Sequence, residues 1–173
     1  MVSTSGSQLL PTDAVNDLRT QLLPLTTVLT PNIPEAKLLL ETSGETPIEP
    51  QNVDDMIRIA KQLQTLGPKN VLLKGGHLPL SETVVRAQSE PKDKDKDEPK
   101  RVVVDVLYRE TGDVVLFETD FLTSKNTHGT GCSLASAIAA NLALGKDLED
   151  AVRSAVRYVE AGIKTSVDLG KGN

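Results

Sequence analysis

The sequence predicts an α/β protein whose mostly parallel sheet is flanked by helices. Helical patterns alternate with short apolar strands along the 173 residues, and this alternation is typical of parallel sheets. Residues 70–73 (NVLL) are apolar without alternation, as expected for a strand that is covered on both faces. The length of the chain corresponds to one ordinary domain. We therefore expect one α/β domain with an aliphatic core.

Composition limits the classes of function. No run approaches the roughly 18 to 20 uninterrupted apolar residues of a membrane span, so we expect no membrane partner. The net charge of −5 and the aromatic content of 2% argue against nucleic acid as a partner. A single cysteine, Cys132, excludes an internal disulfide and a thiolate zinc cage. Because the sequence shows no secretory leader, we expect a reducing, cytosolic location.

The elements of the first half are marked by where their patterns stop. Residues 12–24 repeat valine and leucine at helical spacing and end at a proline. A β-rich run at 25–29 also stops before a proline, and a short helix is expected over 34–40. Residues 53–66 carry one apolar stripe and stop at Gly-Pro, which predicts a longer helix.

The second half begins with a charged interruption. Residues 88–100 contain five acids, four bases and two prolines without a large apolar side chain, which predicts a disordered insertion within the domain. Two strands are expected at 101–108 and 113–118, joined by a tight turn as a β-hairpin at one edge of the sheet. Two helices follow, over 133–144 and over about 147–165.

A glycine-rich junction precedes the helix of small residues. Gly129, Thr130 and Gly131 lie where a loop becomes a helix, so their backbone N–H groups could form an anion hole for phosphate. The Lys-Ser/Thr end of a Walker loop is missing, and a plain close-packing turn explains the glycines equally well. Cys132 follows at the helix N-terminus, where the thiolate is favoured and could act as a base or nucleophile. The alternative is a small buried residue.

Two further segments place polar side chains after predicted strands. Lys74 follows the strand at 70–73 and precedes two glycines, so it could neutralise phosphate beyond the strand end. A lysine that simply reaches solvent is the alternative. Asn32 and Glu35 lie three residues apart at the start of a helix, where they could hold a hydrated Mg²⁺ through its waters. Taken alone, this pair is more typical of a helix capping box.

Three motifs carry a family resemblance: TPNIPEA at 30–36, LLKGGH at 72–77 and NTHGTGCSLASAIAANLALG at 126–145. They resemble the hydroxymethylpyrimidine and phosphomethylpyrimidine kinases of thiamine biosynthesis, which belong to the ribokinase-like superfamily. The third motif is the most specific, because pyridoxal kinases and sugar kinases mostly place aspartate where this chain has Cys132. The resemblance covers nearly the whole chain except the charged insertion, and it implies a parallel-rich ribokinase-like sheet.

The resemblance implies an activity. With ATP and Mg²⁺, such kinases phosphorylate 4-amino-5-hydroxymethyl-2-methylpyrimidine and then its monophosphate. By position, Gly129, Thr130 and Gly131 would form the anion hole for the transferring phosphoryl group, and Cys132 would be the base. Contacts with the nucleotide would come from Lys74, Thr123, Gly129 and Gly131. Asn32 and Glu35 would organise the metal.

The resemblance also implies that residues 1–173 are a partial kinase domain, truncated at the N-terminus. Members of the family begin with a strand and a glycine-rich segment that holds the pyrimidine, and Met1 corresponds to the last residue of their Asp-Pro-Val-Met motif. We therefore expect the nucleotide half of the site here and much of the pyrimidine pocket upstream. The alternatives are a non-catalytic remnant that binds nucleotide or a partner and, less favoured, a pyridoxal kinase. A homodimer is a further expected assembly.

Overall fold

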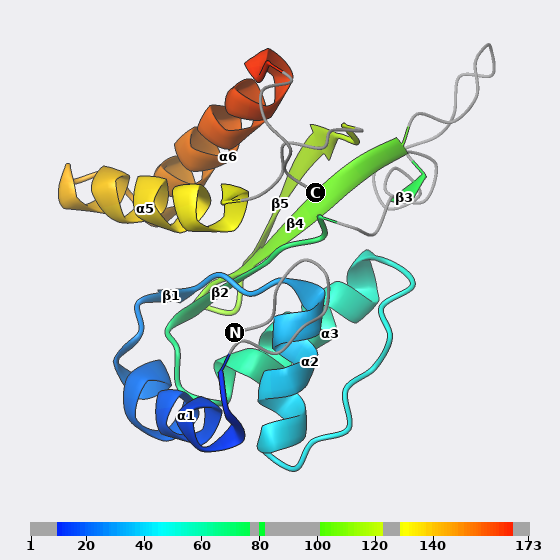
Figure 1. Ribbon diagram of the computed structural model, residues 1–173, viewed down its shortest axis with the longest axis vertical. Coiled ribbons are helices and arrows are strands. Elements are labelled where there is room, and N and C mark those ends of the chain that lie inside the picture. The colour runs from blue at the N-terminus through cyan, green and yellow to red at the C-terminus, as the bar shows by residue number, and fades with distance from the viewer. Residues whose placement is uncertain (1–9, 77–79, 82–100, 123–128, 168–173) are drawn as a thin grey trace. The chain divides into compact units, whose positions relative to one another are not determined.

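The computed structural model describes residues 10–76, 80–81, 101–122 and 129–167 of the chain. The chain divides into two compact units, residues 1–120 and residues 121–173, and Figure 1 shows the helices and strands of each. No helix in the described ranges is both long enough and apolar enough to cross a lipid bilayer.

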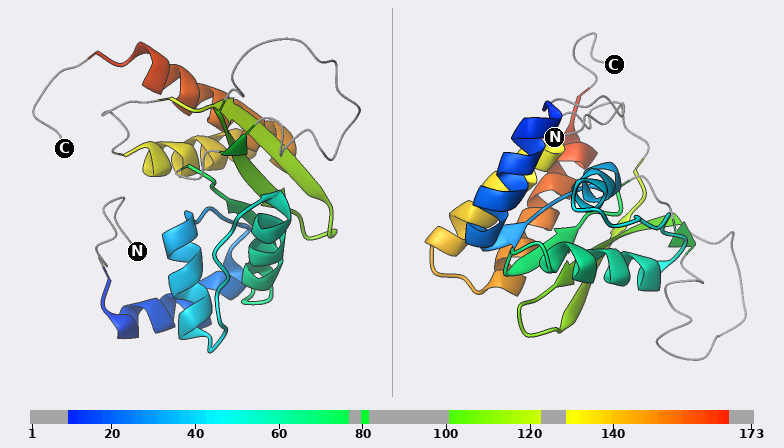
Figure 2. Two further views of the ribbon diagram at one scale, coloured as in Figure 1. Left: turned by 90° about the vertical axis from the view of Figure 1, so that its right-hand side faces the viewer. Right: turned by 90° about the horizontal axis from the view of Figure 1, so that it is seen from below.

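The first unit contains the sheet and the helices of the N-terminal half. Its elements are α1 (Thr12–Asp17), the π-helical turn η1 (Leu18–Leu22), the 3₁₀ turn η2 (Leu23–Leu25), β1 (Val28–Leu29), α2 (Ile33–Thr42), α3 (Val53–Gln64), β2 (Asn70–Leu73), β3 (Leu80–Ser81), β4 (Arg101–Tyr108) and β5 (Val114–Asp120). The second unit contains α5 (Thr130–Ala143) and α6 (Leu148–Thr165), which pack against each other as a helical hairpin (Figure 2).

Side chains at the helix starts explain where the helices begin. The Asn52 carboxamide accepts a hydrogen bond from Asp55 N at 2.9 Å at the start of α3. The Asp147 carboxylate accepts from Asp150 N at 2.9 Å before α6. Each bond satisfies an N–H group of the first turn that has no partner within the helix. The predicted extents of these two helices are confirmed to within two residues.

The described strands form one mixed sheet. β1 and β2 are parallel, whereas β4 is antiparallel to β2, β3 and β5. Residues 109–113 are too few for the crossover that a parallel pair needs, and no crossover helix is described between β2 and β4. The α/β class and the edge hairpin, β4 with β5, are confirmed. The expectation of a parallel-rich sheet does not hold for the described strands, because only β1 and β2 are parallel. The charged insertion predicted at 88–100 lies outside the described residues.

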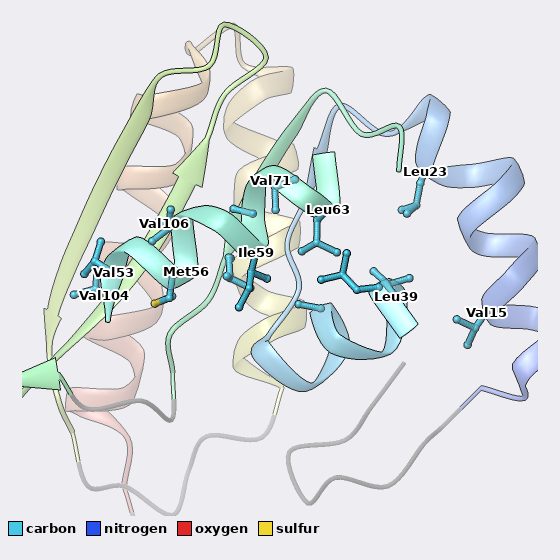
Figure 3. Close-up of a cluster of buried hydrophobic side chains, with 14 of the residues drawn as sticks. Val15, Leu23, Leu39, Val53, Met56, Ile59, Leu63, Val71, Val104 and Val106 are labelled. Atoms are coloured by element: carbon cyan, nitrogen blue, oxygen red, sulfur yellow. The ribbon is translucent and has the colours of Figure 1, made fainter. Parts of the chain in front are cut away.

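One face of the sheet packs against α2 and α3. Alternate residues of β4 lie on this face: Val102, Val104 and Val106 are all buried in the main hydrophobic cluster. In Figure 3 the side chains of Met56 and Ile59 on α3 lie next to these strands. Fully burying such an aliphatic side chain contributes about 1.5 to 3 kcal/mol, so this packing fixes the position of the strand ends.

Asn70 is the one buried polar residue among those that the structure describes. Its Nδ2 donates to the Thr27 carbonyl at 2.8 Å, and its Oδ1 accepts from Glu110 N at 2.9 Å. The side chain thereby joins the start of β2 to the segment before β1 and to the residues after β4. These are connections between parts of the chain that are far apart in sequence.

We predict that Asn70→Ala lowers the free energy of unfolding by about 1 to 3 kcal/mol, because it removes both part-buried side-chain bonds, the one that the Glu110 N–H donates and one of the two that the Thr27 carbonyl accepts from Asn70. Urea unfolding followed by circular dichroism measures the change. Asn141→Ala is the matched control, since Asn141 Nδ2 bonds only the Ala137 carbonyl of its own helix, at 2.8 Å, among the bonds described. Equal unfolding midpoints for the two variants would contradict the bridging role of Asn70.

Candidate functional site

The candidate site lies where the parallel strands β1 and β2 end. The carboxyl ends of parallel strands meet at one edge of a sheet, which is the usual place for a ligand in α/β folds. Asn32 and Lys74 form a parallel β-bridge just past these strand ends, and Lys74 N donates to the Pro31 carbonyl at 2.9 Å. The structure therefore brings together two of the predicted segments, the start of α2 and the turn after β2.

A capping box closes the start of α2. The Asn32 carboxamide oxygen accepts from Glu35 N at 2.8 Å, and Glu35 Oε2 accepts from Asn32 N at 3.0 Å. This confirms the capping-box interpretation of the pair. Because the N-terminus of a helix carries partial positive charge, α2 presents a surface that favours anions at the strand edge.

The same two side chains have the donor types that Mg²⁺ prefers, a carboxylate and an amide oxygen. Within the described ranges no group of three or more His, Cys, Asp or Glu side chains could hold a metal ion. A Mg²⁺ ion at Asn32 and Glu35 would therefore take most of its ligands from water and from phosphate. The residues fit a hydrated ion of this kind.

Asp105 completes this edge of the sheet, and the sequence reasoning missed it. The β2–β4 register pairs Leu73 with Val106, so a continued ladder would place Lys74 opposite Asp105. The ladder stops there, and Gly75 N donates instead to Asp105 Oδ1 at 2.8 Å. The available signal was an acid within the otherwise apolar strand VVVDVLY.

Gly75 is held against β4 by backbone contact as well. A Cβ atom at this position would lie 2.2 Å from the Val104 carbonyl oxygen and 3.1 Å from its carbonyl carbon. No side chain fits in that space, so the first residue after Lys74 has to be glycine. The turn that carries Lys74 is thus fixed by a hydrogen bond and by close packing.

The partly buried Asp105 carboxyl is electrostatically perturbed. Burial raises the pKa of Asp105 from its ordinary 3.8 to about 6, while the hydrogen bond from Gly75 and the positive charge of Lys74 act in the opposite direction. Between about pH 4 and pH 6 the folded chain therefore binds more protons at Asp105 than the unfolded chain does.

We predict that the stability of the wild-type chain relative to Asp105→Asn falls as the pH rises from about 4 to about 6, and is constant above that range. The sign follows because a carboxyl with a raised pKa favours folding most when it is protonated. Urea unfolding of both proteins at several pH values measures this difference, and Asp113→Asn at the exposed β4–β5 turn is the control. A difference that rises over this range contradicts the assignment.

The third predicted segment lies at the start of α5, in the second unit. Gly129 is the N-cap residue and has φ of 78°, a conformation that favours glycine, and its carbonyl accepts from Ser133 N at 2.9 Å. Thr130, Gly131 and Cys132 form the first turn. Cys132 is exposed, so the alternative of a small buried cysteine is wrong. Thr123 lies outside the described residues.

The comparisons with known proteins show the family of the chain. The family model described as phosphomethylpyrimidine kinase matches residues 1–173. The thiamine biosynthesis bifunctional protein ThiED of Geobacter sulfurreducens is 37% identical over 173 residues, which are 100% of this chain and 30% of that protein. The hydroxymethylpyrimidine/phosphomethylpyrimidine kinase of Haemophilus influenzae is 33% identical over an alignment of 175 positions, which covers 100% of this chain and 56% of that enzyme.

Solved structures show the same fold. The Bacillus subtilis pyridoxal kinase in its ADP complex matches with a TM-score of 0.71 and 34% identity, over 94% of this chain and 53% of that one. The phosphomethylpyrimidine kinase of Clostridium difficile matches with a TM-score of 0.63 and 34% identity, over 94% and 54%. The chain thus spans about half the length of these kinases. The ribokinase-like fold class is confirmed.

Proposed function

Since the chain belongs to the phosphomethylpyrimidine kinase family, we propose that it supplies the nucleotide-binding half of a kinase for 4-amino-5-hydroxymethyl-2-methylpyrimidine and its monophosphate in thiamine diphosphate biosynthesis. Kinases of this kind use ATP. The observation that supports the proposal most is the meeting of Lys74 with the capped start of α2 at the ends of two parallel strands. Phosphoryl transfer needs such positioning and charge neutralisation more than any other contribution.

In the proposed mechanism the acceptor hydroxyl oxygen attacks the γ-phosphorus while the bond to the β–γ bridging oxygen breaks and ADP leaves. Lys74 neutralises nucleotide phosphate oxygens, and the backbone N–H groups of residues 129–131 stabilise the transferring group. Cys132 accepts the hydroxyl proton. Mg²⁺, held by Asn32 and Glu35 through its waters, would neutralise phosphate charge. A contact of Thr123 with the nucleotide is part of the same proposal.

The test is a phosphorylation assay that measures ADP release and identifies the product by mass spectrometry. It compares the 173-residue chain with a version extended upstream by the glycine-rich segment typical of the family. Turnover by the extended version alone supports a kinase whose acceptor pocket lies mostly upstream. Turnover by neither version, with ATP still bound by both, favours the alternative of a non-catalytic remnant.

A pyridoxal kinase is the second candidate, because the Bacillus subtilis pyridoxal kinase is as similar to this chain, at 34% identity, as the Clostridium difficile phosphomethylpyrimidine kinase. The same assay therefore includes pyridoxal as an acceptor. A higher kcat/KM for pyridoxal than for the hydroxymethylpyrimidine would overturn the main proposal.

A homodimer and a cytosolic location belong to the proposal as well. Light scattering measures whether the chain forms a dimer in solution.

Cys132 is predicted to act in the chemical step and not in nucleotide binding. In the extended version, Cys132→Ala is expected to lower kcat by about 100-fold or more, since a general base contributes roughly that much, while the Kd for ATP stays unchanged. Ser133→Ala, at the exposed neighbouring residue, is the control. Near-normal turnover of Cys132→Ala would remove the thiol from the mechanism.

A further inference from the structure

Asp105 and Lys74 lie on the face of the sheet opposite the main core. On β4, Val104 and Val106 belong to the core cluster, so the residue between them lies on the other face. On β2, Leu73 belongs to the same cluster, so Lys74 is directed away from it by the same alternation. The register brings the two charged residues opposite each other at the end of the β2–β4 ladder.

The contacts of Asp105 converge on the backbone that follows Lys74. Its Oδ1 accepts the Gly75 N–H at 2.8 Å, while Gly75 lies too close to the Val104 carbonyl for any side chain. On the other side of the turn, Lys74 N is bonded to the Pro31 carbonyl at 2.9 Å. Lys74 is therefore held between the segment that leads into α2 and the carboxyl group on β4.

This arrangement has an electrostatic reason. A carboxylate that accepts a backbone N–H bond binds it about twice as strongly as a neutral acceptor does. Burying the carboxylate is unfavourable by itself, and its raised pKa of about 6 reflects that. An acid at this position can accept the bond from the Gly75 N–H, which an apolar side chain of β4 could not do.

We propose that Asp105 is a positioning residue for nucleotide binding: it holds the Lys74–Gly75 turn so that the ammonium group of Lys74 stands at the strand ends beside the start of α2. Asp105 acts through this turn and does not itself contact the nucleotide. The inference rests on the proposed function, because it gives Lys74 the phosphate of a nucleotide as its ligand.

The experiment measures Mg-ATP binding by calorimetry for the wild-type chain, Asp105→Ala, Asp105→Asn and the control Asp113→Ala. Asp113 lies on the exposed β4–β5 turn and accepts bonds from Arg109 and Thr111. We expect Asp105→Ala to raise the Kd about 10-fold. Asp105→Asn keeps an acceptor for Gly75 N, so we expect it to stay within about threefold of wild type, as we expect for Asp113→Ala.

A double-mutant cycle with Lys74→Ala separates positioning from a general structural effect. If Asp105 acts through Lys74, Asp105→Ala will have little further effect once the ammonium group is gone. Asp105→Glu keeps the charge but moves the carboxyl group, and we expect it to weaken binding as alanine does. This variant keeps the test decisive if Asp105→Ala does not fold.

The outcomes distinguish this inference from the proposed function. If the wild-type chain binds no Mg-ATP, the nucleotide site itself is wrong and the inference fails with it. If the wild-type chain binds Mg-ATP and Asp105→Ala and Asp105→Glu bind as well as Asp113→Ala, the site stands and the positioning role is overturned. A full effect of Asp105→Ala in the Lys74→Ala background also overturns it.

Discussion

Gly75→Ala is expected to lower the free energy of unfolding by about 3 kcal/mol or more, because the new methyl group would overlap backbone atoms. The added Cβ would lie 2.2 Å from the Val104 carbonyl oxygen, and the Met56 methyl group stands at 3.4 Å on another side. A flexible side chain could rotate away, but the Val104 carbonyl is backbone of β4, which is paired with β5 at this position and with β2 from Val106 onward. The end of β2 would therefore have to separate from β4.

Gly76→Ala is the matched control for this prediction. A Cβ atom at Gly76 would have no atom within 4 Å, and Gly76 is not among the described glycines with positive φ. We expect a change of less than about 0.5 kcal/mol there, since a compatible Gly→Ala replacement also restricts the unfolded chain. Urea unfolding by circular dichroism measures both variants, and equal stabilities would show that the Val104 contact is not rigid.

Lys74→Ala is expected to raise the Kd for Mg-ATP about 10- to 100-fold, which corresponds to the loss of one or two hydrogen bonds between charged groups. The reason is that Lys74 supplies positive charge at the strand ends, next to the start of α2. Binding of adenosine, which has no phosphate, is expected to change much less. Calorimetry with the two ligands gives this contrast directly.

The control for Lys74→Ala is Lys69→Ala, which removes an exposed lysine just before β2. It is expected to change the Kd for Mg-ATP less than twofold at moderate ionic strength, because an exposed charge at the opposite end of the strand is screened. A similar loss for ATP and adenosine in Lys74→Ala would mean that the lysine supports the fold and does not neutralise phosphate.

Local patterns in the sequence were sufficient to predict most elements and part of the site. The strand Asn70–Leu73 has the predicted bounds, because its apolar run is short and ends at a lysine and two glycines. The Asn32–Glu35 box could be predicted because both bonds join residues three positions apart. Interactions of this kind are encoded within one turn of a helix.

Features that depend on distant segments could not be predicted in the same way. The antiparallel pairing of β2 with β4 joins residues more than 30 positions apart, and no periodicity specifies which strands become neighbours. The role of Asp105 depends on that pairing, since only the register brings it to Gly75. The short strand β3 was missed because two residues carry no pattern.

The β3–β4 pairing has a consequence for how the chain tolerates changes in length. Leu80 pairs with Val102, and Ser81 pairs with Arg101, so residues 82–100 connect two positions that are already adjacent in the sheet. The entropy of closing a loop grows only with the logarithm of its length, and each doubling adds about 0.6 kcal/mol. Insertions and deletions in this connection are therefore thermodynamically mild, and they leave the β2–β4 register unchanged. Natural variation in length, or an inserted affinity tag, would be best accommodated here.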